Sequence, residues 1–194
     1  MHTSEFWTII ESARSAAGPD KPFHEALVDE LTTHSEEAIF RYQERFDDVH
    51  DAVYRWDVWA AAYLIGGGCS DDSFIDFRAG LIALGRDWYE KAAACPDNLA
   101  EHPAVIAAVG ATDYDAIFYE DVNYAADGAF ECVTGGDKDF DTAWTQYAAS
   151  REGYSGHESG DMGEDFDFDD SAEMHRRLPR LAALYLRDTA HQGS

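Results

Sequence analysis

Residues 54–78 read YRWDVWAAAYLIGGGCSDDSFIDFR, and this stretch contains the densest structural signals in the chain. Residues 56–65 are apolar nearly all round, which indicates a central helix that is buried on most sides. The three glycines at 66–68 end that helix, because glycine leaves the helical conformation more readily than other residues. Ser70 then begins a second helix as its N-cap, and the two aspartates that follow favour the positive end of the helix dipole.

The rest of the chain repeats apolar side chains at the spacing of one helix face. Near the N-terminus Phe6, Ile9, Ile10 and Ala13 follow one another at i, i+3, i+4 and i+7. A length of 194 residues with 45% apolar side chains suits one domain with a real core. We therefore expect an all-α fold, a single-domain helical bundle with a buried Trp-rich central helix and an acidic loop before the C-terminal helix.

Three segments are expected along the chain. Residues 1–150 form the helical domain, residues 151–170 an acidic loop rich in Gly, Ser and Asp, and residues 171–194 a C-terminal helix that packs back on the domain. Pro179 interrupts the pattern of this last helix. Residues 114–133 combine β-prone aromatic residues with several alanines, and between strand and helix we expect helix.

The charge balance limits the choice of partners. The chain has 14 Lys and Arg against 39 Asp and Glu, a formal net charge of −25. Nucleic acid and a bare anionic membrane surface are disfavoured, because binding phosphate needs clustered cations and the chain has no Lys/Arg block. An acidic surface can be simply well solvated, as in high-salt organisms. It can also match a basic protein partner, imitate DNA or bind metal.

The cysteines and the N-terminus predict a reducing compartment. Cys69, Cys95 and Cys132 are odd in number and widely spaced, so neither a disulfide framework nor a zinc knuckle is indicated, and we expect buried, reduced thiols. The N-terminus is polar, and no stretch approaches the apolar length of a membrane span. A cytoplasmic location is expected.

The candidate site lies in the central stretch, and two interpretations stay open. Its residues are Trp56, Asp57, Trp59, Tyr63, Ser70, Asp71, Asp72 and Arg78. In the structural interpretation the aromatic residues are core, Asp57 pairs with Arg78 or Arg55, and the Ser-Asp-Asp run is only a helix cap. In the functional one the glycine turn opens onto a cleft with aromatic walls and convergent polar groups, which suits a cationic or sugar-like small molecule.

No motif predicts a metal or a cofactor, and none is expected. P-loop, G-x-G-x-x-G, H-E-x-x-H and G-x-S-x-G patterns are missing from the sequence. Asp165, Asp167 and Asp169 alternate as in a calcium-binding EF-hand loop. The sixth position of that loop is Asp170 instead of Gly, and the twelfth is Arg176 instead of Glu, so a solvated loop is favoured.

Cys69 stands beside a helix N-terminus, which can lower a thiol pKa and activate a nucleophile. No histidine is near it in sequence, and the neighbouring carboxylates oppose a thiolate. Catalysis by Cys69 is therefore disfavoured, and no residue pattern names a reaction.

The sequence resembles the bacterial domain of unknown function 4240 over about its first hundred residues. The matching motifs are Phe6, Trp7 and Ile10 of an opening Phe-Trp-x-x-Ile, then Trp-Asp-x-Trp-x-Ala-Ala-Tyr at 56–63 and Gly-Gly-Cys-Ser-Asp-Asp-x-Phe-x-x-Phe-Arg at 67–78. The resemblance implies no activity.

Two positions depart from the pattern of that family. Gly66 stands where Asn is usual, and Gly80 stands where Trp is usual. The loss of a large side chain predicts a cavity or an altered pocket near Gly80.

We expect a non-catalytic binding or regulatory protein that engages a basic protein partner, as an immunity protein or an inhibitor does. The alternative is a small-molecule-binding protein or an enzyme that uses the cleft between Trp56 and Arg78. A scaffold or oligomeric structural protein is a third interpretation. Whether the chain is an enzyme stays open.

Overall fold

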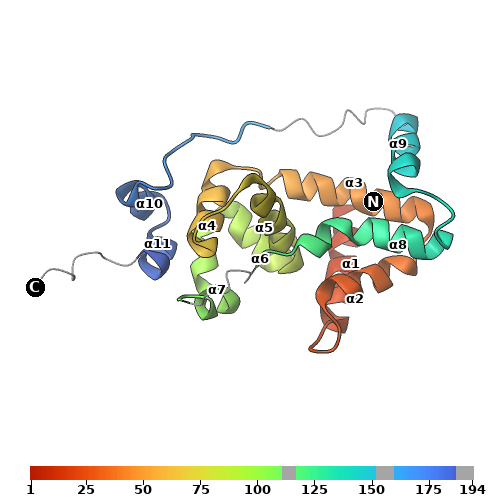
Figure 1. Cartoon of the computed structure of the whole chain (residues 1–194), viewed down its shortest axis with the longest axis horizontal. Helices are drawn as coiled ribbons and strands as arrows, with labels where there is room; N and C mark the ends of the chain where they lie inside the picture. The colour runs from red at the N-terminus through yellow and green to blue at the C-terminus, as the bar shows by residue number, and fades with distance from the viewer. Residues whose placement is uncertain (111–116, 152–159, 187–194) are drawn as a thin grey trace, which may run out of the picture.

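The computed structural model describes residues 1–110, 117–151 and 160–186, and every regular element in these ranges is helical (Figure 1). The elements are α1 (Thr3–Ala16), α2 (Phe23–Thr32), α3 (Glu36–Asp51), α4 (Trp56–Gly66), α5 (Asp71–Ala83), α6 (Arg86–Ala94), η1 (Pro96–Glu101), α7 (Pro103–Ala107), η2 (Glu120–Tyr124), α8 (Ala125–Thr134), α9 (Phe140–Ser150), α10 (Ser171–Arg177) and α11 (Pro179–Tyr185). The predicted all-α, single-domain fold is confirmed.

The opening Phe-Trp pair joins three helices of the core. The ring of Phe6 lies 5.3 Å from that of Tyr42 on α3, and the ring of Trp7 lies 5.1 Å from that of Tyr89 on α6. The Tyr89 hydroxyl donates a hydrogen bond of 2.6 Å to the Val49 carbonyl oxygen. Because all four rings are buried, this cluster ties α1 to α3 and α6.

The central helix α4 is buried on its alanine side, not on its tryptophan side. Its buried residues are Val58, Ala60, Ala61, Ala62, Leu64 and Ile65. The three small alanines let η1 and α11 approach α4 closely. Trp56, Trp59 and Tyr63 are only partly buried, so the expectation of a buried Trp-rich helix is wrong for its large aromatic residues.

The turn between α4 and α5 follows the local sequence signals. Gly67 adopts φ 64°, the left-handed conformation that ends many helices, and the Gly68 amide donates to the Tyr63 carbonyl oxygen at 2.9 Å. The Ser70 hydroxyl caps α5 by accepting from the Ser73 amide at 3.2 Å. The aromatic face of α4 therefore stands beside the N-terminal turn of α5.

The space beside Gly80 is filled, which corrects the predicted cavity. A Cβ placed on Gly80 would lie 1.9 Å from the backbone carbonyl oxygen of Ile117. A Cβ on Gly66 would lie 3.0 Å from the ring of Phe118. The two glycines that depart from the family pattern, Gly66 and Gly80, therefore leave room for the same short segment, residues 117–119. That segment leads into η2 and α8 where we expected one helix, and residues 114–116 of the predicted helix lie outside the described residues.

The C-terminal part forms two short helices, α10 and α11, with the break at Pro179, where the sequence pattern is interrupted, and residues 187–194 of the predicted segment lie outside the described residues. Pro179 begins α11, as its missing amide hydrogen allows. The buried Asp97 of η1 caps this helix, because its carboxylate accepts from the amides of Arg180 and Leu181 at 3.0 and 2.9 Å. This contact holds the C-terminal helices against the domain.

Candidate functional site

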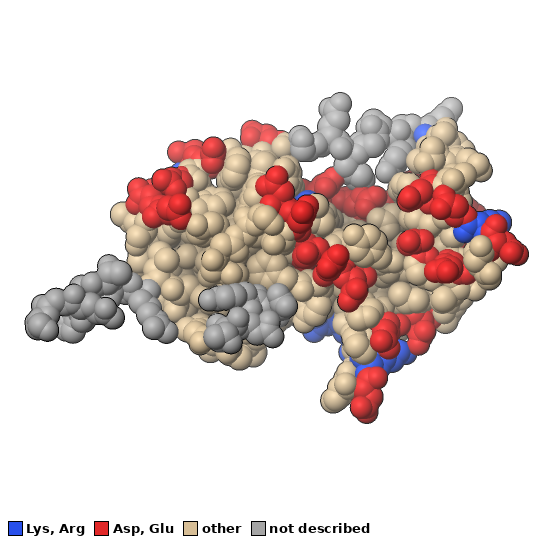
Figure 2. Space-filling model, in the orientation of Figure 1, with Lys and Arg blue, Asp and Glu red and all other residues tan. Residues whose placement is uncertain are grey.

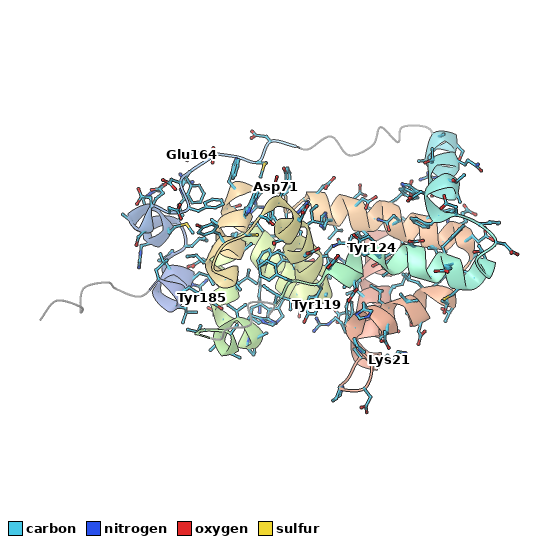
Figure 3. All side chains as sticks on the ribbon, in the orientation of Figure 1. Lys21, Asp71, Tyr119, Tyr124, Glu164 and Tyr185 are labelled. Carbon is cyan, nitrogen blue, oxygen red and sulfur yellow. The ribbon has the colours of Figure 1, made fainter. Side chains whose placement is uncertain are left out.

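A groove of about 500 Å³ opens beside the aromatic face of α4. Its lining residues are Asp51, Tyr54, Trp56, Trp59, Asp71, Phe74, Ile75, Arg78 and Met162. Figure 3 shows Asp71 at the N-terminal end of α5. Of the eight residues predicted for the site, the groove brings together four: Trp56, Trp59, Asp71 and Arg78.

The wall of the groove is a continuous aromatic stack. The rings of Trp56 and Trp59 lie 5.4 Å apart with an interplanar angle of 7°, and those of Trp59 and Phe74 lie 4.7 Å apart at 12°. Tyr54 extends the stack at 5.9 Å from Phe74. The indole Nε1 of Trp59 donates to the Cys69 carbonyl oxygen at 3.1 Å, which fixes the ring orientation. The wall is thus preorganised for a flat or cationic group.

Arg78 lies in the groove wall with only 6% of its surface exposed. Its guanidinium carbon sits 4.7 Å from the Tyr54 ring centre and 5.1 Å from that of Phe74. Nη1 donates to the His50 carbonyl oxygen at 3.3 Å and lies 3.6 Å from the Asp51 carboxylate. The buried Nε finds no acceptor within the described ranges, and burial lowers the pKa of Arg78.

The other four predicted residues serve the scaffold or solvent. Asp57 forms a two-point ion pair with Arg55, with both distances 2.9 Å, and Arg55 Nη1 donates to the Ala93 carbonyl oxygen. Asp57 therefore ties α4 to the end of α6 and does not face Arg78. Ser70 acts as the cap of α5, and Asp72 is exposed beyond the groove.

Tyr63, the last of the eight predicted site residues, anchors the acidic segment that follows the undescribed residues 152–159. Its hydroxyl donates to the Asp169 carboxylate at 2.6 Å, and this bond raises the pKa of Tyr63. The Phe168 ring lies 5.4 Å from the Tyr63 ring and 6.0 Å from the Trp56 ring. The Trp56 amide also donates to the Met162 carbonyl oxygen at 3.1 Å. We call residues 162–169 the strap, because they run along the aromatic face of α4.

One arginine of α10 pairs with the strap. Arg177 lies 2.9 Å from the Glu164 carboxylate and 4.1 Å from the centre of the Phe166 ring. Sequence reasoning did not place the strap at the groove. Its only signal was the pair of aromatic residues, Phe166 and Phe168, in an otherwise polar acidic stretch.

The cysteine environment disfavours nucleophilic chemistry. Burial raises the pKa of the Cys69 thiol to about 12, so the thiol stays protonated at neutral pH. Cys95 and Cys132 are free and exposed, which corrects the expectation that all three thiols are buried. In the described parts of the chain, no three His, Cys, Asp or Glu side chains gather in a way that could hold a metal ion.

Three carboxylates cluster where α5 meets η2, beside the groove. They are Asp72, Asp76 and Glu120, which we call the acidic face. Burial and then the charges of Glu120 and Asp72 raise the pKa of Asp76, and Asn123 donates to its carboxylate at 3.1 Å. Figure 2 shows carboxylates crossing the middle of the face in view with few cations beside them.

Asp76→Asn is expected to stabilise the protein at neutral pH. The pKa of Asp76 is higher in the folded than in the unfolded state, so folding disfavours its ionised form, and stability falls as pH rises through the folded pKa. The amide keeps an oxygen for Asn123 and carries no charge. Thermal unfolding at pH 7 should show a higher melting temperature for the variant, and the difference should shrink toward pH 4. Asp20→Asn, at an exposed turn, is the matched control and should show neither effect.

Fold and site together define an acidic, all-α protein with an aromatic groove beside a cluster of carboxylates. The chain belongs to the family described as Protein of unknown function (DUF4240), whose model matches residues 1–132. No curated protein and no solved structure matches the chain. The matched region contains most of the groove and the whole acidic face but ends before the strap. In the described ranges, the helices are too short or too polar to cross a membrane.

Proposed function

We propose that this protein is a non-catalytic binding protein that engages a basic protein partner through its acidic face, in the manner of an immunity protein or an inhibitor. The observation that carries the proposal is the clustering of Asp72, Asp76 and Glu120 where α5 meets η2, and burial and then the charges of Glu120 and Asp72 raise the pKa of Asp76. Like charges held together lower the stability of the free protein. A cationic partner relieves this repulsion and gains affinity from it.

The protein's own cations support the same proposal, because they are already engaged. In the described ranges each Lys and Arg lies within 4.0 Å of a carboxylate, apart from Lys91, whose Nζ lies 4.2 Å from the Trp88 ring centre. Over the full sequence carboxylates outnumber cations by 25, 39 less 14, so the surface keeps a large negative charge. Such a surface steers a cationic protein toward it, and the attraction is screened by salt.

Exposed apolar side chains border the acidic face. Tyr124 is 60% exposed, Tyr119 38% and Ile75 40%, and Figure 3 shows the two tyrosines on the segment that leads into α8. The Tyr119 amide donates to the Asp76 carbonyl oxygen at 3.1 Å, which places the tyrosine segment directly against the acidic face. Tyrosine is enriched among the residues that dominate protein–protein affinity. Charge and aromatic contact area are thus combined on one surface.

The test is a capture of partners from the native cell extract, eluted through a salt gradient. Wild type should retain one basic protein that moderate salt releases. The variant Asp72→Asn/Asp76→Asn/Glu120→Gln should bind that protein at least about tenfold more weakly, because three interface charges are lost. The control Glu131→Gln/Asp137→Asn/Asp141→Asn makes the same charge change on exposed residues around α8 and α9. Equal loss in both variants, or affinity indifferent to salt, contradicts the proposal.

The groove supports a second candidate, a protein that binds a small molecule. A preformed pocket of about 500 Å³ with aromatic walls and a few polar groups is typical of ligand sites. In that case a ligand raises the melting temperature of wild type, and Trp59→Leu abolishes the rise. No reaction is proposed for this site.

A further inference from the structure

The groove and the acidic face lie along the same helix, α5. Asp71 and Ile75 line the groove, while Asp72 and Asp76 belong to the acidic face, one residue further along α5 in each case. A partner that lies across the N-terminal half of α5 therefore contacts both surfaces at once. The lining residues of the groove indicate which group of the partner it binds.

The mouth of the groove favours a cation. Trp56 and Trp59 present nearly parallel rings that are partly exposed, and a guanidinium group stacks well on such a surface. Asp71 is exposed at the rim and takes part in no ion pair within the described ranges. An anion would meet this carboxylate and the Asp51 carboxylate on its way in.

The groove wall contains a hydrogen-bond donor, Arg78, whose bonding capacity is not filled within the described residues. Arg78 is more than nine-tenths buried, lines the groove and keeps a buried Nε with no acceptor in the described parts of the chain. A guanidinium carries five donors, and here Nη1 donates to the His50 carbonyl oxygen and lies 3.6 Å from the Asp51 carboxylate. A ligand that is only a cation gains nothing from the positive guanidinium of Arg78. A peptide supplies both a cation and, a few ångströms away, a backbone carbonyl oxygen that accepts a hydrogen bond.

We infer that the groove binds an arginine side chain of the basic partner. The arginine stacks its guanidinium on Trp56 beside Asp71, and a backbone carbonyl next to it accepts from the Arg78 guanidinium. This inference rests on the proposed function, since it names the residue of the partner that the surface beside the acidic face would hold. The binding is non-covalent, and the strap residue Met162 closes one side of the groove.

The first experiment uses a small probe in place of the partner. N-acetyl-arginine N-methylamide is titrated into the full chain labelled with ¹⁵N, and the indole resonances of Trp56 and Trp59 are followed. The matching citrulline compound has the same shape without the charge, and it should bind about tenfold more weakly. Butylguanidine has the cation without the carbonyls, and it should bind several-fold more weakly than the capped arginine. Equal binding of all three compounds overturns the inference.

A pair of neighbouring carboxylates supplies the matched variants. Asp71→Asn removes the charge at the groove rim and should weaken the capped arginine about fivefold, while Asp72→Asn, one residue further along α5, should leave its affinity within about twofold. Both residues are exposed in the first turn of α5, so the two changes cost the fold about the same. Equal effects of the two variants, or resonance shifts that miss Trp56 and Trp59, also overturn the inference.

The failure of the inference can be told apart from the failure of the proposed function. Trp56→Leu should weaken capture of the basic partner at least about tenfold, with the circular dichroism spectrum unchanged. If Trp56→Leu leaves capture intact while the acidic-face variant loses it, the arginine inference is wrong and the proposed function stands. If the capped arginine binds in the groove but the extract yields no basic protein, the proposed function is wrong.

Discussion

Gly80→Ala is expected to destabilise the protein by about 3 kcal/mol, because the added methyl group has no room. A Cβ at this position would lie 1.9 Å from the Ile117 carbonyl oxygen and 2.8 Å from its carbonyl carbon. Both are backbone atoms and cannot turn aside as the end of a side chain does. The segment would have to leave α5, and its hydrogen bond from the Tyr119 amide to the Asp76 carbonyl would be lost. Urea denaturation followed by circular dichroism measures the change.

Gly128→Ala is the matched control for this prediction. It makes the same chemical change inside helix α8, where a Cβ would lie 3.5 Å from a methyl group of Val28, an ordinary contact. Alanine has the higher helix propensity, so this variant should gain about 1 kcal/mol. If Gly80→Ala unfolds at the same urea concentration as wild type, the close approach of Ile117 to α5 is wrong.

The second large effect is expected from Asp97→Ala, with a loss of about 2–3 kcal/mol. Asp97 is 4% exposed and accepts from the backbone amides of Arg180 and Leu181, and Arg180 Nε lies 3.1 Å from it. Removal leaves the first turn of α11 without its acceptor in a buried place. Hydrogen–deuterium exchange should show faster exchange across residues 171–186, ahead of the rest of the chain.

Glu101→Gln provides the control, because Glu101 is the exposed partner of the same Arg180 side chain. An exposed ion pair contributes between 0 and about 1 kcal/mol, so exchange across α10 and α11 should stay close to that of wild type. A comparable opening of α10 and α11 in both variants would show that Asp97 does not hold them.

The central stretch could be predicted from the sequence because its signals are local. Three glycines, a serine cap and two aspartates lie within a few residues of the ends that they determine, and the structure follows them. The same stretch also suggested full burial of the tryptophans. The prediction of buried tryptophans failed because α4 has one side made of alanines, and η1 and α11 pack against that side. The large aromatic rings therefore lie on the other side, along the groove.

The errors arise where residues distant in the sequence meet. A glycine at position 80 predicts a cavity only if nothing else fills the space, and Ile117 fills it from 37 residues away, 117 less 80. The strap reaches Tyr63 through Asp169, a separation of 106 residues. For Asp57 the two predicted partners were Arg78 and Arg55, and the structure pairs it with Arg55, which also donates to the Ala93 carbonyl oxygen at the end of α6. Periodicity carries no information about such pairings.

A hydrogen-exchange footprint of the protein with its captured basic partner locates the binding surface. The partner should slow exchange in two places, residues 71–76 of α5 and residues 119–124 with the start of α8. The groove should share this protection through residues 54–59. Protection confined to α9 or to the outer face of α2, with α5 unchanged, would show that the acidic face is not the binding surface.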